Sequence, residues 1–85
     1  MTSKNKTILI TDDDESLRRV IEYNLSNKGY RLLLANNGEE ALNIFKSEDV
    51  DVVVTDIKME KMDGLELLEE IKRLDKISLV IMITA

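Results

Sequence analysis

Four short apolar runs, separated by amphipathic stretches, constrain the fold of this chain more than any other feature. The runs occupy residues 8–10, 30–35, 50–55 and 77–84. Each is too short to predict a helix, and the first, third and fourth are rich in β-branched residues. Unbroken apolar runs of this kind are typical of strands that are covered on both faces. The second run begins with Tyr30 and Arg31, so we expect it to lie nearer the edge of a sheet.

Three stretches between these runs carry apolar residues at the three- and four-residue spacings of an amphipathic helix. The first ends at Lys28-Gly29, where a cation and a glycine that tolerates positive φ form a typical helix stop. The second and third begin with capping-box sequences at residues 37–40 and 63–66. The apolar positions are Leu17, Val20, Ile21 and Leu25; then Ala41, Leu42 and Phe45; then Leu65, Leu68 and Ile71, with Leu67 and Leu74 beside them.

The predicted order of elements is β-α-β-α-β-α-β. This order indicates an α/β fold with a parallel sheet and crossover helices. The 85 residues contain no proline, repeat or low-complexity tract that would mark a linker. We therefore expect residues 1–85 to form one domain or part of one.

Acidic residues gather where the predicted strands end. Asp12 and Asp13 follow the first run, Asp56 follows the third, and Thr84 closes the fourth. Ligands of open α/β sheets bind at the carboxyl ends of strands, in the crevice where the winding direction reverses. If strands two and three flank strand one, the three carboxylates meet there and repel one another unless a cation lies among them. Because the chain has no His and no Cys, Mg²⁺ is the ion we expect.

The composition removes several classes of function. The absence of Cys and His excludes thiolate catalysis, Ser-His triads and zinc fingers. A formal net charge of −5 argues against direct binding of nucleic acid. The basic pair Arg18-Arg19 is most simply a solvated helix face, with Arg19 paired to Glu15. The polar start of the chain predicts neither a signal peptide nor a membrane span, so we expect a cytoplasmic protein.

Each candidate site residue also has a simpler explanation when it is taken alone. Asp is a common helix N-cap, which accounts for Asp14 and, singly, for Asp12 or Asp13. Capping explains Asp56 less well, because a loop rather than a helix start follows it. Thr84 alone is an ordinary β-branched strand residue. The hypothesis of a metal and phosphoryl site therefore depends on these residues occurring together at the strand ends, and not on any one of them.

Five segments, taken together, resemble the receiver domain of two-component response regulators. The resemblance covers nearly the whole chain, in order and with gaps similar to those of the family. It implies a flavodoxin-like (CheY-like) doubly wound parallel sheet with strand order 2-1-3-4, with the first helix on one face and the second and third on the other. The segments are ILITDDD (residues 8–14), NGEEAL (37–42), VVTDIKM (53–59), MDGLELL (62–68) and VIMITA (80–85).

The resemblance implies a role for each matching residue. Asp56 resembles the phosphoacceptor of the family. Asp12 and Asp13 resemble the acidic pair, of which the second binds Mg²⁺ directly and the first usually acts through water. Lys58 matches the position whose backbone carbonyl completes the metal site. Thr84 resembles the hydroxyl that moves toward the phosphoryl group on activation.

The resemblance also implies partners. A histidine kinase or a phosphotransfer protein would supply the phosphoryl group, and an output domain outside this chain would receive the signal. The sequence around the third and fourth runs is similar to receivers of enhancer-binding transcription activators, so we expect a DNA-binding output domain. The chain itself is then a signalling module and not an enzyme that turns over a substrate.

Two features depart from the family pattern. Glu60 stands where the family usually has Pro, so we expect a less rigid loop after Asp56. The residues given stop at Ala85, whereas a family receiver continues with a fourth helix, a fifth strand and a fifth helix. We therefore expect a partial receiver with impaired autophosphorylation. Its last strand would form an apolar edge that promotes oligomerisation or exchange of elements.

Two alternative functions remain open from the sequence. The chain could act only as a structural or oligomerising module. It could also be a phosphatase of the haloacid dehalogenase type, because residues 12–16 weakly resemble the signature of that family, with Asp12 as the nucleophile. Ser16 does not fit that signature, and such enzymes need a longer chain.

Overall fold

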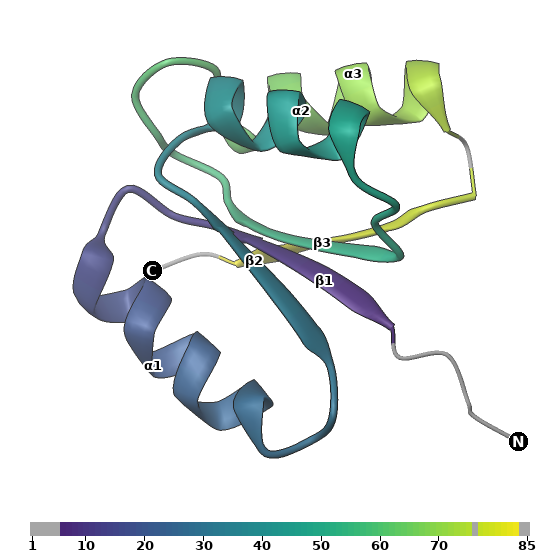
Figure 1. Ribbon diagram of the computed structural model, residues 1–85. Coiled ribbons are helices and arrows are strands. Elements are labelled where there is room, and N and C mark those ends of the chain that lie inside the picture. Colours follow the sequence, from purple (N-terminus) through teal and green to yellow (C-terminus); the bar gives the residue numbers. More distant parts are fainter. Residues whose placement is uncertain (1–5, 76, 84–85) are drawn as a thin grey trace, which may run out of the picture.

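A four-stranded parallel sheet forms the centre of the computed structural model, which describes residues 6–75 and 77–83 (Figure 1). The strand order is β2-β1-β3-β4, and all three pairings are parallel. This order confirms the predicted doubly wound sheet. In chain order the elements are β1 Thr7–Thr11, α1 Glu15–Ser26, β2 Arg31–Ala35, α2 Gly38–Ser47, β3 Val52–Asp56, α3 Gly64–Leu74 and β4 Leu79–Ile83.

The helices cover the two faces of the sheet unequally. Figure 1 shows α1 on one face and α2 and α3 together on the other, as predicted. The buried core lies between the sheet and the α2–α3 pair, whereas no residue of α1 is fully buried. The core cluster contains Leu9, Ala35, Ala41, Leu42, Phe45, Val50, Val53, Leu67 and Ile71. No helix among the described residues is long and apolar enough to cross a membrane.

The four strands differ in burial according to their place in the sheet. Every residue of β1 is buried, because β2 and β3 flank it and helices cover both of its faces. β2 is an edge strand, as its polar start predicted, and Arg31 is exposed there. β4 is the other edge of the described sheet, and its side chains Leu79 and Ile81 remain 56% and 44% exposed. On the face of the sheet that carries α1, an apolar surface over β3 and β4 is therefore left uncovered by that helix.

Side-chain caps fix where the helices begin. The Asp14 carboxylate accepts hydrogen bonds from the backbone N–H groups of Ser16 and Leu17, which confirms its predicted capping role. At α3 the predicted capping box is complete, because Asp63 and Glu66 each accept from the other's backbone N–H.

Three details of the predicted helices were wrong. The α2 box is incomplete: Asn37 accepts from Glu40 as expected, but the Glu40 carboxylate bonds the N–H of Asn36, outside the helix. Helix α1 ends at Ser26, so Lys28 lies beyond its last turn, although Gly29 has the expected positive φ of 82°. On α3 the fully buried residues are Leu67 and Ile71, whereas Leu65 is 55% exposed. The buried stripe of α3 is set by how the helix packs, which spacing alone does not determine.

Candidate functional site

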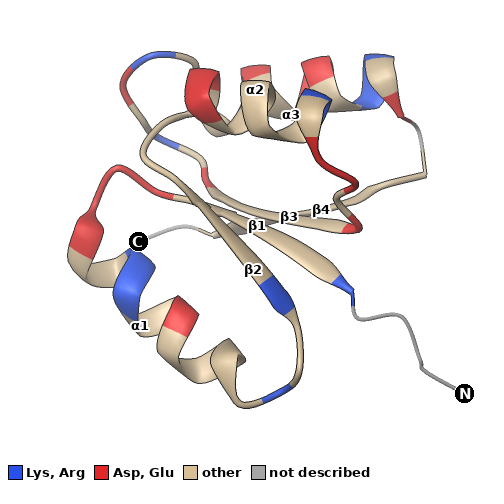
Figure 2. Cartoon of the chain, viewed as in Figure 1, with Lys and Arg blue, Asp and Glu red and all other residues tan. Residues whose placement is uncertain are grey.

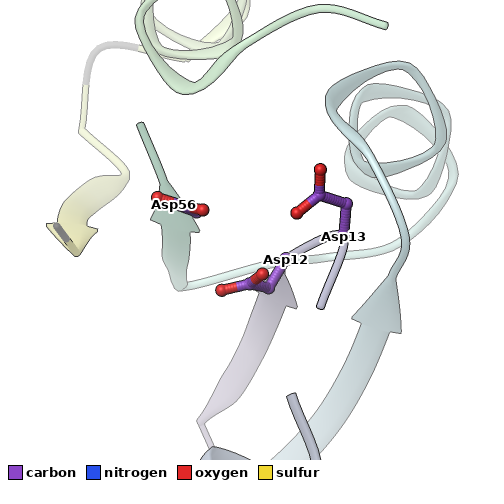
Figure 3. Close-up of side chains that lie close together, drawn as sticks. All are labelled: Asp12, Asp13 and Asp56. Atoms are coloured by element: carbon purple, nitrogen blue, oxygen red, sulfur yellow. The ribbon is translucent and has the colours of Figure 1, made fainter. Parts of the chain in front are cut away.

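Three carboxylates meet at the carboxyl end of the sheet. Asp12 and Asp13 follow β1, and Asp56 is the last residue of β3. The two strands pair in parallel with Thr11 opposite Thr55, so the residues that follow lie side by side. One carboxylate oxygen from each aspartate lies within 4.8 Å of the other two. Figure 3 shows the three side chains around a common space between the ends of β1 and β3.

The Asp12 side chain is held in a nearly inaccessible position. It is 1% exposed, whereas Asp13 is exposed and Asp56 is half-buried. Its Oδ1 accepts a hydrogen bond of 2.8 Å from the N–H of Asp14. Its Oδ2 is buried and has no hydrogen-bond partner among the residues that the structure describes. A buried carboxylate oxygen without a partner is costly, so this atom would be stabilised by a cation or by a water molecule bound to one.

The electrostatics of the site oppose three ionised carboxylates. Burial raises the pKa of Asp12 above its ordinary value, and the negative charges of Asp56, Asp13 and Asp14 raise it further; the hydrogen bond from the Asp14 N–H acts in the opposite direction. Figure 2 shows this acidic group at the ends of β1 and β3. A cation among the three carboxylates would remove the repulsion.

The donor set fits Mg²⁺. All three side chains offer oxygen, which is the ligand that Mg²⁺ prefers, and it commonly keeps several waters beside one or two carboxylates. The unpartnered Oδ2 of Asp12 could accept a hydrogen bond from such a water. Lys58, the predicted carbonyl ligand, lies two residues beyond Asp56 in the loop that leads to α3. Thr84 lies outside the described residues.

The sequence interpretation missed one basic residue near the site. Arg18 was expected on a solvated face, but its Nη1 donates a 2.7 Å hydrogen bond to the backbone carbonyl of Asp12. The predicted pair of Arg19 with Glu15 is present at 2.9 Å. Arg18 follows Asp12 by six positions, and α1 begins between them, so the first turn of the helix brings Arg18 back toward the end of β1. The spacing in the sequence could therefore have predicted this contact.

Comparison with known proteins identifies the family. The response regulator receiver domain family matches residues 8–85. The chain belongs to this family. The family match favours the receiver hypothesis over the haloacid dehalogenase alternative. The grouping of Asp12, Asp13 and Asp56 at the ends of β1 and β3 is consistent with this choice.

Individual receivers resemble the chain closely. The alkaline phosphatase synthesis transcriptional regulatory protein PhoP of Bacillus subtilis is 37% identical over 81 residues, which are 95% of this chain and 34% of that protein. The response regulator TrrA of Thermotoga maritima, solved in complex with Mg(2+)-BeF, is 40% identical with a TM-score of 0.90, and the match covers 94% of this chain and 70% of that one. TrrA has also been solved in complex with the histidine kinase ThkA, with a TM-score of 0.87, 40% identity and coverage of 94% and 69%. The chain thus spans about a third of this curated relative and about two thirds of these solved receivers.

Proposed function

We propose that residues 1–85 are part of a response regulator receiver in which Asp56 accepts a phosphoryl group from a histidine kinase. Mg²⁺ would be held by Asp12, Asp13 and Asp56 together with the backbone carbonyl of Lys58. The observation that carries the proposal is the convergence of three carboxylates within 4.8 Å around a buried, unpartnered oxygen of Asp12. The complexes of the relative TrrA with Mg(2+)-BeF and with a histidine kinase support the proposed ion and partner.

The proposed reaction is a phosphoryl transfer between side chains. A carboxylate oxygen of Asp56 attacks the phosphorus of a phosphohistidine as the P–N bond breaks, and the imidazole leaves with the electron pair. The product is an acyl phosphate on Asp56. Bound Mg²⁺ would supply charge neutralisation at the transferring group. The hydroxyl of Thr84 is proposed to donate a hydrogen bond to a phosphoryl oxygen.

The role of the chain is then signalling and not turnover of a substrate. Phosphorylation would control an output domain or partner, and the resemblance to the transcriptional regulator PhoP favours control of transcription. A phosphotransfer protein could replace the kinase as donor. We propose that this occurs in the cytoplasm, without direct contact of residues 1–85 with nucleic acid, since their net charge is −5.

Phosphorylation by a small donor tests the proposal directly. The chain is incubated with acetyl phosphate and Mg²⁺, and intact mass spectrometry follows the gain of one phosphoryl group. Asp56→Asn should abolish the gain, whereas Glu60→Gln, which removes an exposed acid from the following loop, should retain it. No gain in the unmodified chain, or an undiminished gain in Asp56→Asn, would contradict the proposed phosphoacceptor.

We also propose that residues 1–85 associate with a second copy through β4. The strand lies at the edge of the described sheet, with its apolar residues Leu79 and Ile81 about half exposed. An exposed apolar edge of this kind recruits further strands. The association would be a self-pairing or an exchange of elements between copies.

A further inference from the structure

The loop between Asp56 and α3 rests directly on the first residue of α2. Gly38 is buried at this contact, and a Cβ built on it would lie 2.1 Å from the backbone oxygen of Met62 and 2.9 Å from its carbonyl carbon. Ordinary van der Waals contact begins at about 3.4 Å, so even one methyl group at position 38 would displace the loop by about an ångström. The absence of a side chain therefore sets how closely the loop approaches.

The loop residues at this contact adopt an unfavourable backbone conformation. Lys61 and Met62 have φ values of 53° and 68°, in the left-handed region that non-glycine residues rarely occupy. Such residues persist only where the surroundings hold them. Here the N–H of Glu39 donates to the Lys61 carbonyl at 3.3 Å, and the Met62 side chain packs against the core cluster. The start of α2 thus holds the loop in one conformation.

A second glycine fixes the base of the same loop. The N–H of Gly64 donates a 2.7 Å hydrogen bond to the carbonyl of Ile57, and a Cβ on Gly64 would lie 2.3 Å from the carbonyl oxygen of Asp56. Gly64 therefore fixes the start of the loop at Ile57, and Gly38 fixes the loop near its end at Met62. Lys58, whose carbonyl is the proposed fourth protein ligand, lies between these anchors.

We infer that Gly38 is a positioning residue for the Mg²⁺ site: by seating the loop directly on α2, it sets the position that the Lys58 carbonyl takes relative to the three carboxylates. The inference rests on the proposed function. Gly38 itself belongs to α2 and not to the acidic cluster. Its replacement would change the affinity of the site without removing a ligand.

The Mg²⁺-dependent gain in stability measures this role separately from damage to the fold. Urea unfolding is recorded in EDTA and at increasing Mg²⁺, and the gain at each concentration gives the dissociation constant. A clash that only destabilises the fold lowers both curves equally and leaves the gain unchanged. For Gly38→Ala we expect a dissociation constant raised about tenfold, since changes in the residues that orient ligands commonly weaken metal binding by 10- to 100-fold.

Two variants serve as matched controls. Gly29→Ala also replaces a glycine by alanine and is strained by its φ of 82°, but apart from its chain neighbours no described residue lies within 4 Å of the added Cβ. The residue precedes β2 at the other end of the sheet. Ala41→Gly weakens α2 itself without altering its first residue. Both should unfold at lower urea, and both should retain the Mg²⁺ dissociation constant of the unmodified chain within twofold.

The outcomes separate this inference from the proposed function. Unchanged Mg²⁺ affinity in a folded Gly38→Ala would overturn the inference alone. Failure of the unmodified chain to bind Mg²⁺ would overturn the proposed function and the inference together. If Gly38→Ala does not fold, Met62→Ala decides, because it removes the side chain that packs the loop against the core and so loosens the seating of the loop on α2 while leaving every ligand in the chain. A raised dissociation constant in Met62→Ala supports the inference, and an unchanged one overturns it.

Discussion

Replacing Asp12 by Asn should stabilise the metal-free chain. The substitution removes the negative charge of a side chain that is 1% exposed and keeps its shape. An Asn oxygen can still accept the hydrogen bond that Oδ1 receives from the Asp14 N–H. What changes is the repulsion from Asp13 and Asp56 and the cost of burying a charge.

The magnitude follows from the geometry of the three carboxylates. Two unit charges 4.8 Å apart repel by about 1 kcal/mol at the dielectric constant of water and by about 3 kcal/mol at an effective value of 20. Asp13 is exposed and Asp56 half-buried, so screening keeps each pair nearer the lower figure. With two such pairs, we expect Asp12→Asn to raise the free energy of unfolding by about 2 kcal/mol at neutral pH in EDTA.

The pH dependence gives this prediction a second, independent test. Because the pKa of Asp12 is raised in the folded chain above its unfolded value, the folded state binds the proton more readily between the two values. The destabilisation is therefore fully present above the folded pKa and is relieved as pH falls through it. The difference between Asp12→Asn and the unmodified chain should shrink on acidification toward the unfolded value of 3.8.

Urea unfolding in EDTA across this pH range is the assay. Asp51→Asn is the matched control, since Asp51 is a half-buried aspartate that also accepts a backbone hydrogen bond, from Thr7, at the opposite end of the sheet. It should give no comparable gain in stability. A loss of stability in Asp12→Asn at neutral pH in EDTA would refute the electrostatic reasoning. In Mg²⁺ the variant should lose its advantage, because the site then binds the ion more weakly.

Three further substitutions test other parts of the structure. Asp63→Ala should lower the free energy of unfolding by about 1 kcal/mol in urea, because it removes the N-cap of α3; an unchanged value would mean that the capping box contributes nothing. Ile81→Lys should shift the chain toward the monomer in sedimentation experiments, whereas Leu65→Lys, at an equally apolar exposed position on α3, should not; an unshifted Ile81→Lys would exclude the β4 edge as the contact. Arg19→Ala should leave the urea midpoint unchanged, because its ion pair with Glu15 is exposed; a clear loss of stability would contradict this.

The topology and the meeting of the three aspartates could be predicted because both depend on repeating patterns. Short β-branched runs alternate with helical spacings, and parallel strands connected by crossover helices leave few arrangements. Once β1 lies between β2 and β3, the residues at the carboxyl ends of β1 and β3 must come together. Asp12 and Asp56 are therefore 44 positions apart in the sequence but adjacent in space.

The remaining features depend on contacts that no periodicity encodes. The left-handed Lys61 and Met62 carry no sequence signature, because neither is Gly, Asn or Asp. The contacts of this loop with Gly38 and Gly64 also bring together residues that no spacing in the sequence relates. The bond from Arg18 to the Asp12 carbonyl likewise depends on the angle at which α1 leaves the strand.

The energetic costs of this chain are concentrated at one end of the sheet. The buried charge of Asp12 and the left-handed pair Lys61 and Met62 each oppose folding, and they belong to segments that begin at adjacent strand ends. The core between the sheet and α2–α3 must offset both in the metal-free chain. A cation bound among the carboxylates would remove the electrostatic part and leave the backbone part. Binding of Mg²⁺ at the proposed site would therefore be coupled to folding, whereas the backbone strain of Lys61 and Met62 would remain, offset by the contacts of the loop with α2 and the core.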